Sequence, residues 1–139
     1  MEDRGWQHFP HGADLGVCGR GPTIEASFEE AAKAMTAAIT TAAVRATTRV
    51  DVECKSANPE LLFVAWLNAI IYEMAVRQML FGTFEARITG NQLTGVISGE
   101  PVDRARHEPA CEPKGATFTA LKVGQDASGR WSACCVVDV

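Results

Sequence analysis

The last two residues of this 139-residue sequence, Asp138 and Val139, place a side-chain carboxylate beside a main-chain carboxylate. They follow an apolar run over residues 131–137 that is typical of a packed strand. Carboxylates held this close repel each other unless water or a cation screens them. A third carboxylate, that of Asp14, lies in the segment His-Gly-Ala-Asp-Leu-Gly near the other end of the sequence. If the fold brings Asp14 to the chain end, the result is a cation site made only of oxygen ligands.

The type of ligand determines which cation such a site would prefer. Carboxylate oxygens are hard ligands that suit Ca²⁺, Mg²⁺ or Mn²⁺ better than Zn²⁺. Spacing alone favours a simpler interpretation, in which Asp14 and Asp138 are solvated carboxylates at the ends of strands. The residues by themselves therefore leave both interpretations open.

Three further polar candidates, His107, Glu108 and Lys114, lie in a proline-rich loop predicted over residues 99–115. Loops held on a rigid scaffold often carry function, and a loop this long without regular structure is itself typical of a functional segment. Exposed loop residues without a specific role fit the same pattern.

Motifs that would indicate an enzyme are missing or have a structural explanation. There is no Gly-x-Ser-x-Gly elbow and no convincing Ser/His/Asp or Cys/His arrangement. His8 and His11 are expected to form local hydrogen bonds rather than to catalyse. The glycines at positions 16, 19 and 21 could cradle a phosphate at a helix N-terminus, but they match neither the dinucleotide fingerprint nor a P-loop. Bends in an edge strand are the preferred interpretation.

The five cysteines are irregularly spaced and form no CxxC pair, so a structural zinc site is not expected. The adjacent Cys134 and Cys135 point to opposite faces of a strand and are poorly placed to bond to each other. No signal peptide is recognisable either. We therefore predict that the cysteines are reduced core residues of a cytoplasmic protein.

The composition limits the partners of the chain. With 13 basic and 17 acidic residues the net charge is −4, which argues against tight nucleic-acid binding by this chain alone. The basic cluster Arg104, Arg106 and His107 is offset by neighbouring acids, so a solvated mixed-charge loop is expected. The apolar run over residues 61–72 is too short for a membrane span, which needs about 20 residues, and predicts a buried core helix.

The predicted elements form a single α+β domain over residues 1–139. Thr23 is a helix cap followed by an apolar stripe, and Asn58 with Pro59 begins a second helix that runs to about Arg77. Alternation of apolar and polar residues and turn residues predict strands at 6–9, 13–20, 49–55, 84–89, 93–98, 117–124 and 130–138. Two helices cannot cover both faces of so many strands, so we expect a two-layer domain with a mixed or antiparallel sheet packed against the helices.

Several motifs occur in one consistent order along the sequence. Residues 11–17 read His-Gly-Ala-Asp-Leu-Gly-Val, which resembles the signature His-Thr-Ala-Asp-(Val/Ile)-Gly of the archease family. Further resemblances follow in the family's order at residues 21–32, 62–68, 99–108, 114–117 and 136–139. The departures are Gly12 in place of the usual Thr, and Pro109, Cys111 and Pro113 where the family usually has Leu, Thr or Val.

The resemblance implies an accessory protein of the RtcB-type RNA ligase, which joins tRNA exons and repairs broken RNA. That ligase uses GTP to guanylylate an active-site histidine and then activates an RNA 3′-phosphate. An archease promotes the guanylylation and turnover, and it can widen nucleotide use. The resemblance also implies a divalent cation site, often calcium, at Asp14, Asp138 and Val139, and a functional role for Lys114.

We therefore predict a non-catalytic activator that contacts the ligase through Lys114, His107, Glu108 and His11 and meets RNA only through the ligase. The alternative is a stand-alone metal-dependent hydrolase or nucleotide-binding enzyme that uses the same oxygen cluster. A chaperone-like module is also conceivable, but the sequence shows no apolar stripe that is expected to be exposed.

Overall fold

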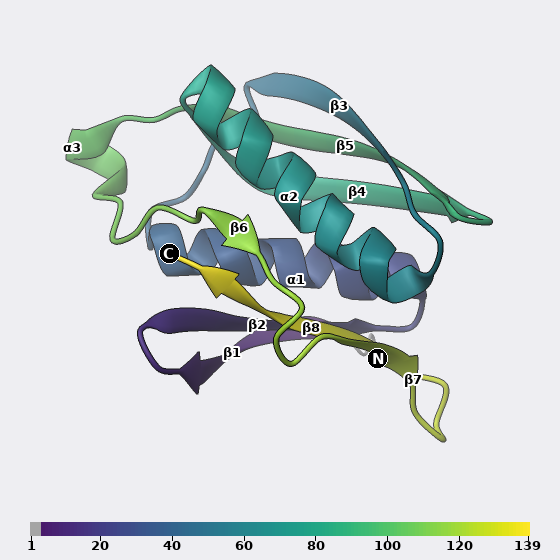
Figure 1. Cartoon of the computed structure of the whole chain (residues 1–139). Coiled ribbons are helices and arrows are strands. Elements are labelled where there is room, and N and C mark those ends of the chain that lie inside the picture. Colours follow the sequence, from purple (N-terminus) through teal and green to yellow (C-terminus); the bar gives the residue numbers. More distant parts are fainter. Residues whose placement is uncertain (1–3) are drawn as a thin grey trace.

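Two antiparallel sheets and two long helices form most of the computed structural model, which describes residues 4–139 (Figure 1). Residues 1–3, which the predicted domain includes, lie outside the described residues. The elements are β1 (Gly5–His11), β2 (Asp14–Gly21), α1 (Ile24–Ile39), β3 (Thr48–Lys55), α2 (Pro59–Arg77), β4 (Met79–Thr89), β5 (Gln92–Pro101), α3 (Arg104–His107), β6 (Gly115–Ala116), β7 (Lys122–Gln125) and β8 (Trp131–Asp138).

The strands divide into two sheets. The first sheet has the order β1-β2-β8-β6, with β7 also paired to β8, and the second has the order β3-β5-β4. All strand pairs are antiparallel. The predicted α+β class is confirmed, but there are two sheets rather than one, because β2 pairs with the C-terminal strand β8 while β3 pairs with β5.

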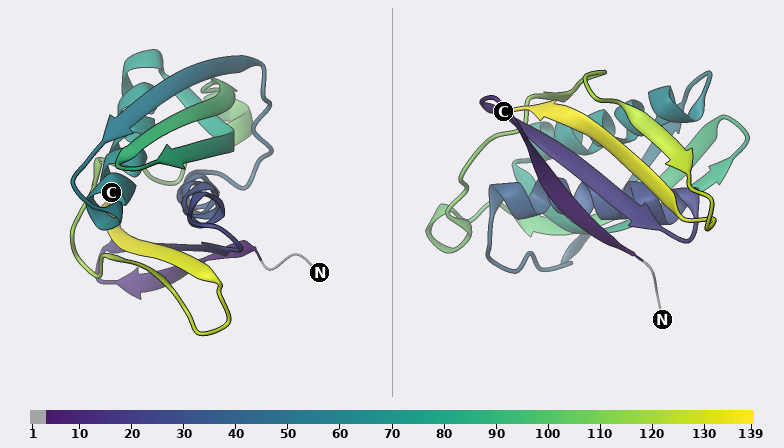
Figure 2. Two further views of the ribbon diagram at one scale, coloured as in Figure 1. Left: turned by 90° about the vertical axis from the view of Figure 1, so that its right-hand side faces the viewer. Right: turned by 90° about the horizontal axis from the view of Figure 1, so that it is seen from below.

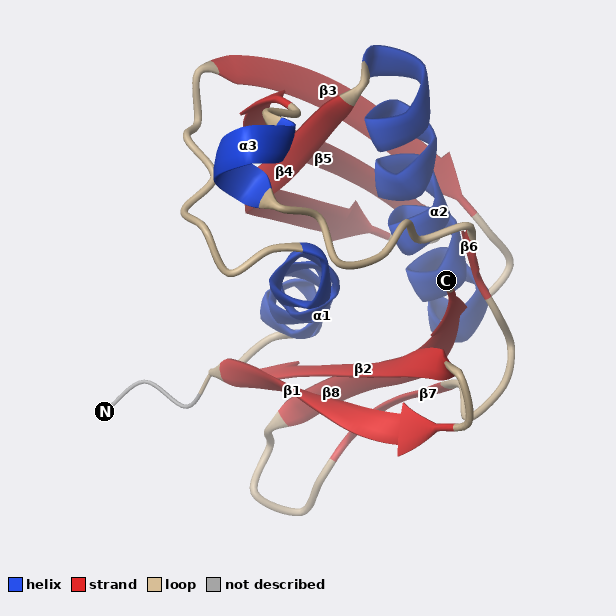
Figure 3. Cartoon of the chain, turned by 90° about the vertical axis from the view of Figure 1, so that its left-hand side faces the viewer, coloured by secondary structure: helices blue, strands red, loops and turns tan. Residues whose placement is uncertain are grey.

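Helix α1 lies between the two sheets (Figure 3). Thr23 caps it as predicted, and its hydroxyl accepts a hydrogen bond from the main-chain N–H of Ala26 at 3.0 Å. The helix packs so closely on β2 that a Cβ added to Gly19 would lie 2.2 Å from the carbonyl oxygen of Ser27. That glycine therefore serves helix packing on a strand that lies inside the sheet, not at its edge.

The other side of α1 covers an edge of the second sheet. β4 is the last strand of that sheet, so its outer main-chain groups need partners. The carboxylate of Glu29 accepts a hydrogen bond from the main-chain N–H of Ala86 at 2.8 Å. An acidic side chain of α1 thus satisfies an N–H group of the β4 edge.

Helix α2 is the predicted core helix. Its length and composition would allow it to cross a membrane, yet it buries seven of its side chains in the domain, among them Phe63, Trp66 and Leu67. The indole N–H of Trp66 donates to the carbonyl oxygen of Phe28 in α1 at 3.0 Å and so connects the two helices. The left view of Figure 2 shows the second sheet above α1, and β1 and β2 below it. Helix α2 packs on the second sheet and also contacts β6, β7 and β8 of the first sheet.

The outer face of α2 is apolar as well. Leu61, Tyr72 and Val76 are 36%, 62% and 57% exposed. The expectation that no apolar stripe is exposed was therefore wrong. A helix that is apolar on all sides leaves one apolar face uncovered when only the others are packed.

The C-terminal hairpins differ from the prediction. The strand predicted over 117–124 is reduced to β7, because Ala120 adopts a left-handed conformation with φ of 55° and interrupts the extended chain, and the short strand β6 lies just before the predicted start. β4 and β5 are longer than predicted, and α3 occupies part of the segment expected to be a loop. The irregular segment before β6 is correspondingly shorter.

Candidate functional site

The register of the first sheet brings Asp14 to the C-terminal end of the chain. Leu15 of β2 pairs with Val137 of β8, so one step further along the antiparallel ladder Asp14 lies opposite Asp138. Val137 is fully buried on the α1 side of the sheet. Because successive residues of a strand alternate between faces, both aspartates lie on the other, outer face. The fold thus brings Asp14 to the C-terminal end of the chain, which the sequence alone set only as a condition.

A tight turn places His11 at the same end of the sheet. His11 and Asp14 are the last pair of the β1–β2 hairpin and flank the two-residue turn of Gly12 and Ala13. Gly12 has a φ of 59°, which glycine adopts without steric cost. A positive φ at the first central position with glycine fits a type II′ turn. The exposed His11 therefore neighbours the aspartates without contributing to the core.

Lys114 reaches the same end from the other side of β8. Gly115 pairs with Asp138, and the main-chain N–H of Lys114 donates to the carbonyl oxygen of Asp138 at 2.8 Å. One step further along this antiparallel pair, Lys114 lies opposite Val139. Within residues 4–139 no ion pair involves the Lys114 ammonium or the Asp138 carboxylate. A cation and several carboxylates thus share one sheet end without neutralising one another directly.

The donor set of this sheet end, Asp14, Asp138 and the Val139 carboxylate, suits a hard divalent cation. No group of three or more His, Cys, Asp or Glu side chains that could hold a metal occurs in the described part of the chain. The predicted site would therefore use the side chains of Asp14 and Asp138 and the main-chain carboxylate of Val139. All three supply oxygen, the ligand type that Ca²⁺ and Mg²⁺ prefer. Asp138 is exposed and the other two are half-buried, so water could complete the coordination.

A disulfide joins the two strands that carry the aspartates. Cys18 of β2 pairs with Cys134 of β8 in the register, with their Cα atoms 4.2 Å apart, and their sulfurs are bonded. The prediction that all cysteines are reduced was therefore wrong, whereas Cys134 and Cys135 are indeed not bonded to each other. The register explains the pairing, because directly opposite residues on one face of a sheet lie within bonding reach. The cysteines thus no longer support the cytoplasmic location predicted from them.

The structure does not bring His107 to this sheet end. His107 is 2% exposed, its Nδ1 accepts the main-chain N–H of Asp103 at 2.8 Å, and its Nε2 donates to Glu100 at 3.1 Å. Glu108, by contrast, is exposed just after α3. A side chain as enclosed as His107 could affect a partner only through its neighbours.

The acceptor of this hydrogen bond, Glu100, is a buried acid that sequence reasoning missed. Its carboxylate also binds the guanidinium of Arg106 and accepts the main-chain N–H of Arg45 at 2.7 Å. The hydrogen bond from Arg106, followed by that from Arg45, lowers the pKa of Glu100 to about 2. The expected solvated mixed-charge loop is therefore only partly present, because Arg106 and His107 fold onto a buried carboxylate. The acid that precedes this basic cluster by a few residues was the available signal in the sequence.

Known proteins resemble this chain in both sequence and fold. The sequence matches the profile of the Archease protein family over residues 6–139. The Protein archease of Pyrococcus furiosus is 31% identical over 141 residues, which cover 98% of this chain and 99% of the relative. The Protein archease of Methanopyrus kandleri is 34% identical over 139 residues, which cover 96% and 99%.

Solved structures agree with this relation. The solution structure of a Methanobacterium thermoautotrophicum protein has a TM-score of 0.79 at 25% identity and matches 97% of this chain and 99% of its own. The crystal structure of a Thermotoga maritima protein, described as an archease and possible chaperone, has a TM-score of 0.64 at 18% identity and matches 96% of each chain. Since the family profile spans nearly the whole sequence and full-length relatives exceed 30% identity, the chain belongs to the archease family.

Proposed function

We propose that this protein is a non-enzymatic activator of an RtcB-type RNA ligase and acts in tRNA splicing and RNA repair. Membership of the archease family supports the proposal, and one structural observation carries it. The register of β2, β8 and β6 gathers Asp14, Asp138 and Lys114 at one open end of a sheet. These side chains form no ion pair within residues 4–139, so their charges are available to contact a partner.

The chemistry of this sheet end suits the nucleotide step of such a ligase. A bound divalent cation, calcium or alternatively magnesium or manganese, would offset the repulsion between the carboxylates and supply further coordination positions for oxygen ligands. Asp14, Asp138 and the Val139 carboxylate would hold it, while Lys114 presents a positive charge beside them. An activator must bind one state of its partner more tightly than another. We propose that this sheet end favours the state competent for guanylylation.

RNA is proposed to meet this protein only through the ligase. The net charge of −4 offers little attraction to a polyanion. We also propose that the protein has no turnover of its own. A stand-alone metal-dependent hydrolase would instead show hydrolysis of GTP or a phosphoester by the isolated protein.

Ligase guanylylation tests the proposal directly. The ligase is incubated with GTP and wild-type protein, Asp14→Asn, Asp138→Asn or Lys114→Met, and the covalent guanylyl-ligase is quantified. Loss of a ligand or of the neighbouring charge is expected to reduce stimulation by about tenfold or more. Asp51→Asn, an exposed acid on β3 in the other sheet, is the matched control and should stimulate like wild type. Full stimulation by all three site variants would contradict the proposal.

A second candidate function follows from the outer face of α2. Exposed apolar patches mark protein–protein contact sites, and Tyr72 and Val76 are more than half exposed here. We propose as an alternative that this face binds apolar segments of unfolded proteins. The test is suppression of the aggregation of an unrelated protein by wild type and by the Tyr72→Ser, Val76→Ser double variant. Equal activity of the two proteins, or none from either, would exclude this face as a chaperone surface.

A further inference from the structure

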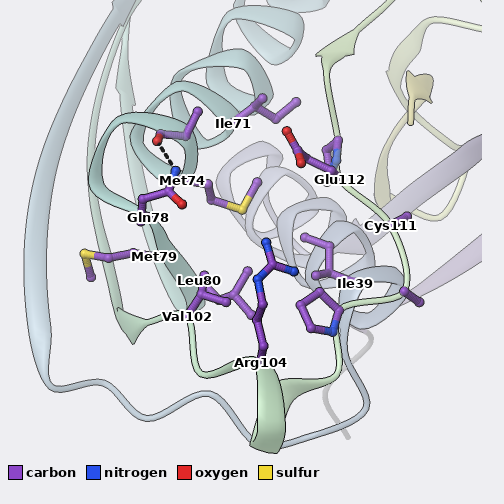
Figure 4. A pocket seen from close by; sticks show the side chains of 14 residues that line it. Ile39, Ile71, Met74, Gln78, Met79, Leu80, Val102, Arg104, Cys111 and Glu112 are labelled. Atoms are coloured by element: carbon purple, nitrogen blue, oxygen red, sulfur yellow. Dashed lines mark hydrogen bonds between the residues drawn. The ribbon is translucent and has the colours of Figure 1, made fainter.

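A cavity of about 380 Å³ lies on the inner side of the C-terminal half of α2, and its wall ends at Pro113, next to Lys114 of the sheet end described above. Helices α1 and α2, the start of β4 and the segment over residues 102–113 line it, and one side is open to solvent. Figure 4 shows its lining side chains converging on a common space. The volume falls in the range of about 300–1,000 Å³ that is typical of small-molecule sites.

Most of the residues that line the cavity are apolar, although polar atoms supply nearly half of its exposed surface. The side chains that form it include Ile39 from α1, Ile71 and Met74 from α2, and Leu80 from β4. Methionine side chains are flexible and polarizable, so they adapt to ligands of different shape. The apolar part of the wall suits a hydrocarbon body, and the polar part suits the polar group of an amphipathic ligand.

One cation points into this cavity. α3 contains two basic side chains, those of Arg106 and His107, that turn toward the buried Glu100. Arg104 turns the other way, and Figure 4 shows its guanidinium between Met74 and Ile39. Within residues 4–139 no side-chain hydrogen bond or ion pair involves this guanidinium. Arg104 is thus the basic residue of α3 that is left available to a ligand.

An acid limits what the cavity could accept. Glu112 also lines it and lies across the space from Arg104 (Figure 4). The two groups are not within ion-pair distance of each other. A ligand with several negative charges would be repelled by Glu112, whereas one with a single negative charge could bind Arg104 alone.

We propose that this cavity binds a small amphipathic carboxylic acid. The carboxylate pairs with the guanidinium of Arg104, which matches its planar two-oxygen geometry, and the hydrocarbon part packs against Met74 and Ile71. The same chemistry is available in a free acid and in the C-terminal residue of an apolar peptide. None of the cavity residues belongs to the proposed cation site, so this inference does not depend on the proposed function.

Nuclear magnetic resonance titration of the 14.9 kDa protein tests the inference. The probes are octanoate, which represents a free acid, and acetyl-alanyl-leucine with a free carboxylate, which represents a peptide end. Octan-1-ol and the leucine amide of the same dipeptide are the neutral counterparts. Backbone amide shifts of cavity residues locate the binding, and the titration gives each dissociation constant.

Arg104→Gln should weaken binding of the acids by about tenfold and leave the neutral counterparts unchanged, because only the charge-assisted hydrogen bond is lost. Met74→Trp should fill the cavity and weaken the acids and neutral probes alike. Arg87→Gln, an exposed arginine on β4, should bind like wild type. The tighter of the two acids would identify the source of the natural ligand.

Several results would overturn the inference. One is the absence of shifts at cavity residues with either acid at about 10 mM, a concentration that detects binding weaker than 1 mM. A second is equal affinity of the acids for wild type and Arg104→Gln. A third is binding centred on the outer face of α2, which the loss of shifts in Tyr72→Ser would reveal.

Discussion

Two polar clusters in this protein combine carboxylates with basic residues, and they differ in whether those groups have partners. Glu100, near the end of β5, accepts hydrogen bonds from Arg106, from the ring of His107 and from the main chain of Arg45. At the open end of the first sheet, in contrast, Asp14 and Asp138 lie opposite each other. Within residues 4–139 neither of their carboxylates accepts a side-chain hydrogen bond.

The difference follows from solvent access. A buried charge must be paired and hydrogen-bonded, because no water is present to solvate it. The Glu100 cluster meets this requirement, and the low pKa of its acid reflects the fixed positive groups around it. Carboxylates at a strand end can remain unpaired because water reaches them. The first cluster therefore supports the fold, whereas the second is available for binding, and the following predictions test that division.

The largest expected effect separates the histidines of the two clusters. His107→Ala removes a buried ring, takes one of three hydrogen bonds from Glu100 and leaves the Asp103 N–H without a partner, so the free energy of unfolding should fall by about 3–4 kcal/mol. His11→Ala, at the open end, should change it by less than about 0.5 kcal/mol. Urea unfolding of both variants provides the measurement. If both variants lose a similar amount of unfolding free energy, the distinction between a structural cluster and one available for binding is wrong.

The second prediction concerns the disulfide that holds the strands of the open end together. Cys18 and Cys134 are 116 residues apart in sequence, so their bond restricts a long loop of the unfolded chain. Replacing both by serine should lower the free energy of unfolding by about 3 kcal/mol. A reducing agent should destabilise wild type by a similar amount and leave the double variant unaffected. Cys111→Ser is the control, and an equal response of that variant and the double variant would argue against the bond.

Local signals in the sequence predicted much of this fold. Thr23 and Asn58 were identified as helix caps from their neighbours alone, and both accept the expected main-chain hydrogen bonds. The strand over residues 49–55 followed from alternation, and its burial alternates accordingly. Caps and alternation depend on residues within a few positions, which is why sequence reasoning recovered them.

Long-range pairing was harder to predict. Nothing local indicates that Cys18 lies opposite Cys134, or that Glu100 meets Arg45 across the fold. The same limit applied to the candidate site, where Asp14 and Asp138 were a pair only on condition that β2 and β8 are neighbours. The register of those strands depends on the packing of α1 beneath them, a property of the whole chain.

The third prediction uses the acid of the buried cluster. The folded protein lowers the pKa of Glu100 from its ordinary 4.5 to about 2. A lowered pKa contributes stability that is complete above the unfolded value and is lost as the pH falls through the folded value. Glu100→Gln should therefore be less stable than wild type at pH 7, and the difference should shrink between about pH 4.5 and pH 2. Urea midpoints across this range test it, and a gap that does not change with pH would contradict it.

The smallest expected effect has the opposite sign and concerns the open cluster. Asp138→Asn makes the same chemical change as Glu100→Gln, an acid to its amide, but removes repulsion from Asp14 and the chain end rather than a set of hydrogen bonds. Without divalent cations it should therefore raise the free energy of unfolding, by about 0.5 kcal/mol.

Calcium should reverse this order of stability. A ligand that binds only the folded state stabilises that state, and a tighter ligand stabilises it more. Ca²⁺ should therefore raise the melting temperature of wild type and leave that of Asp138→Asn nearly unchanged. Two residues appended after Val139 would remove the main-chain carboxylate from this position and should reduce the calcium response while Asp14 and Asp138 remain. Calorimetry with calcium and with a chelator distinguishes these proteins. If Asp138→Asn is destabilising without calcium, the carboxylates of the open cluster support the fold as Glu100 does. The proposed difference between the two clusters would then be wrong.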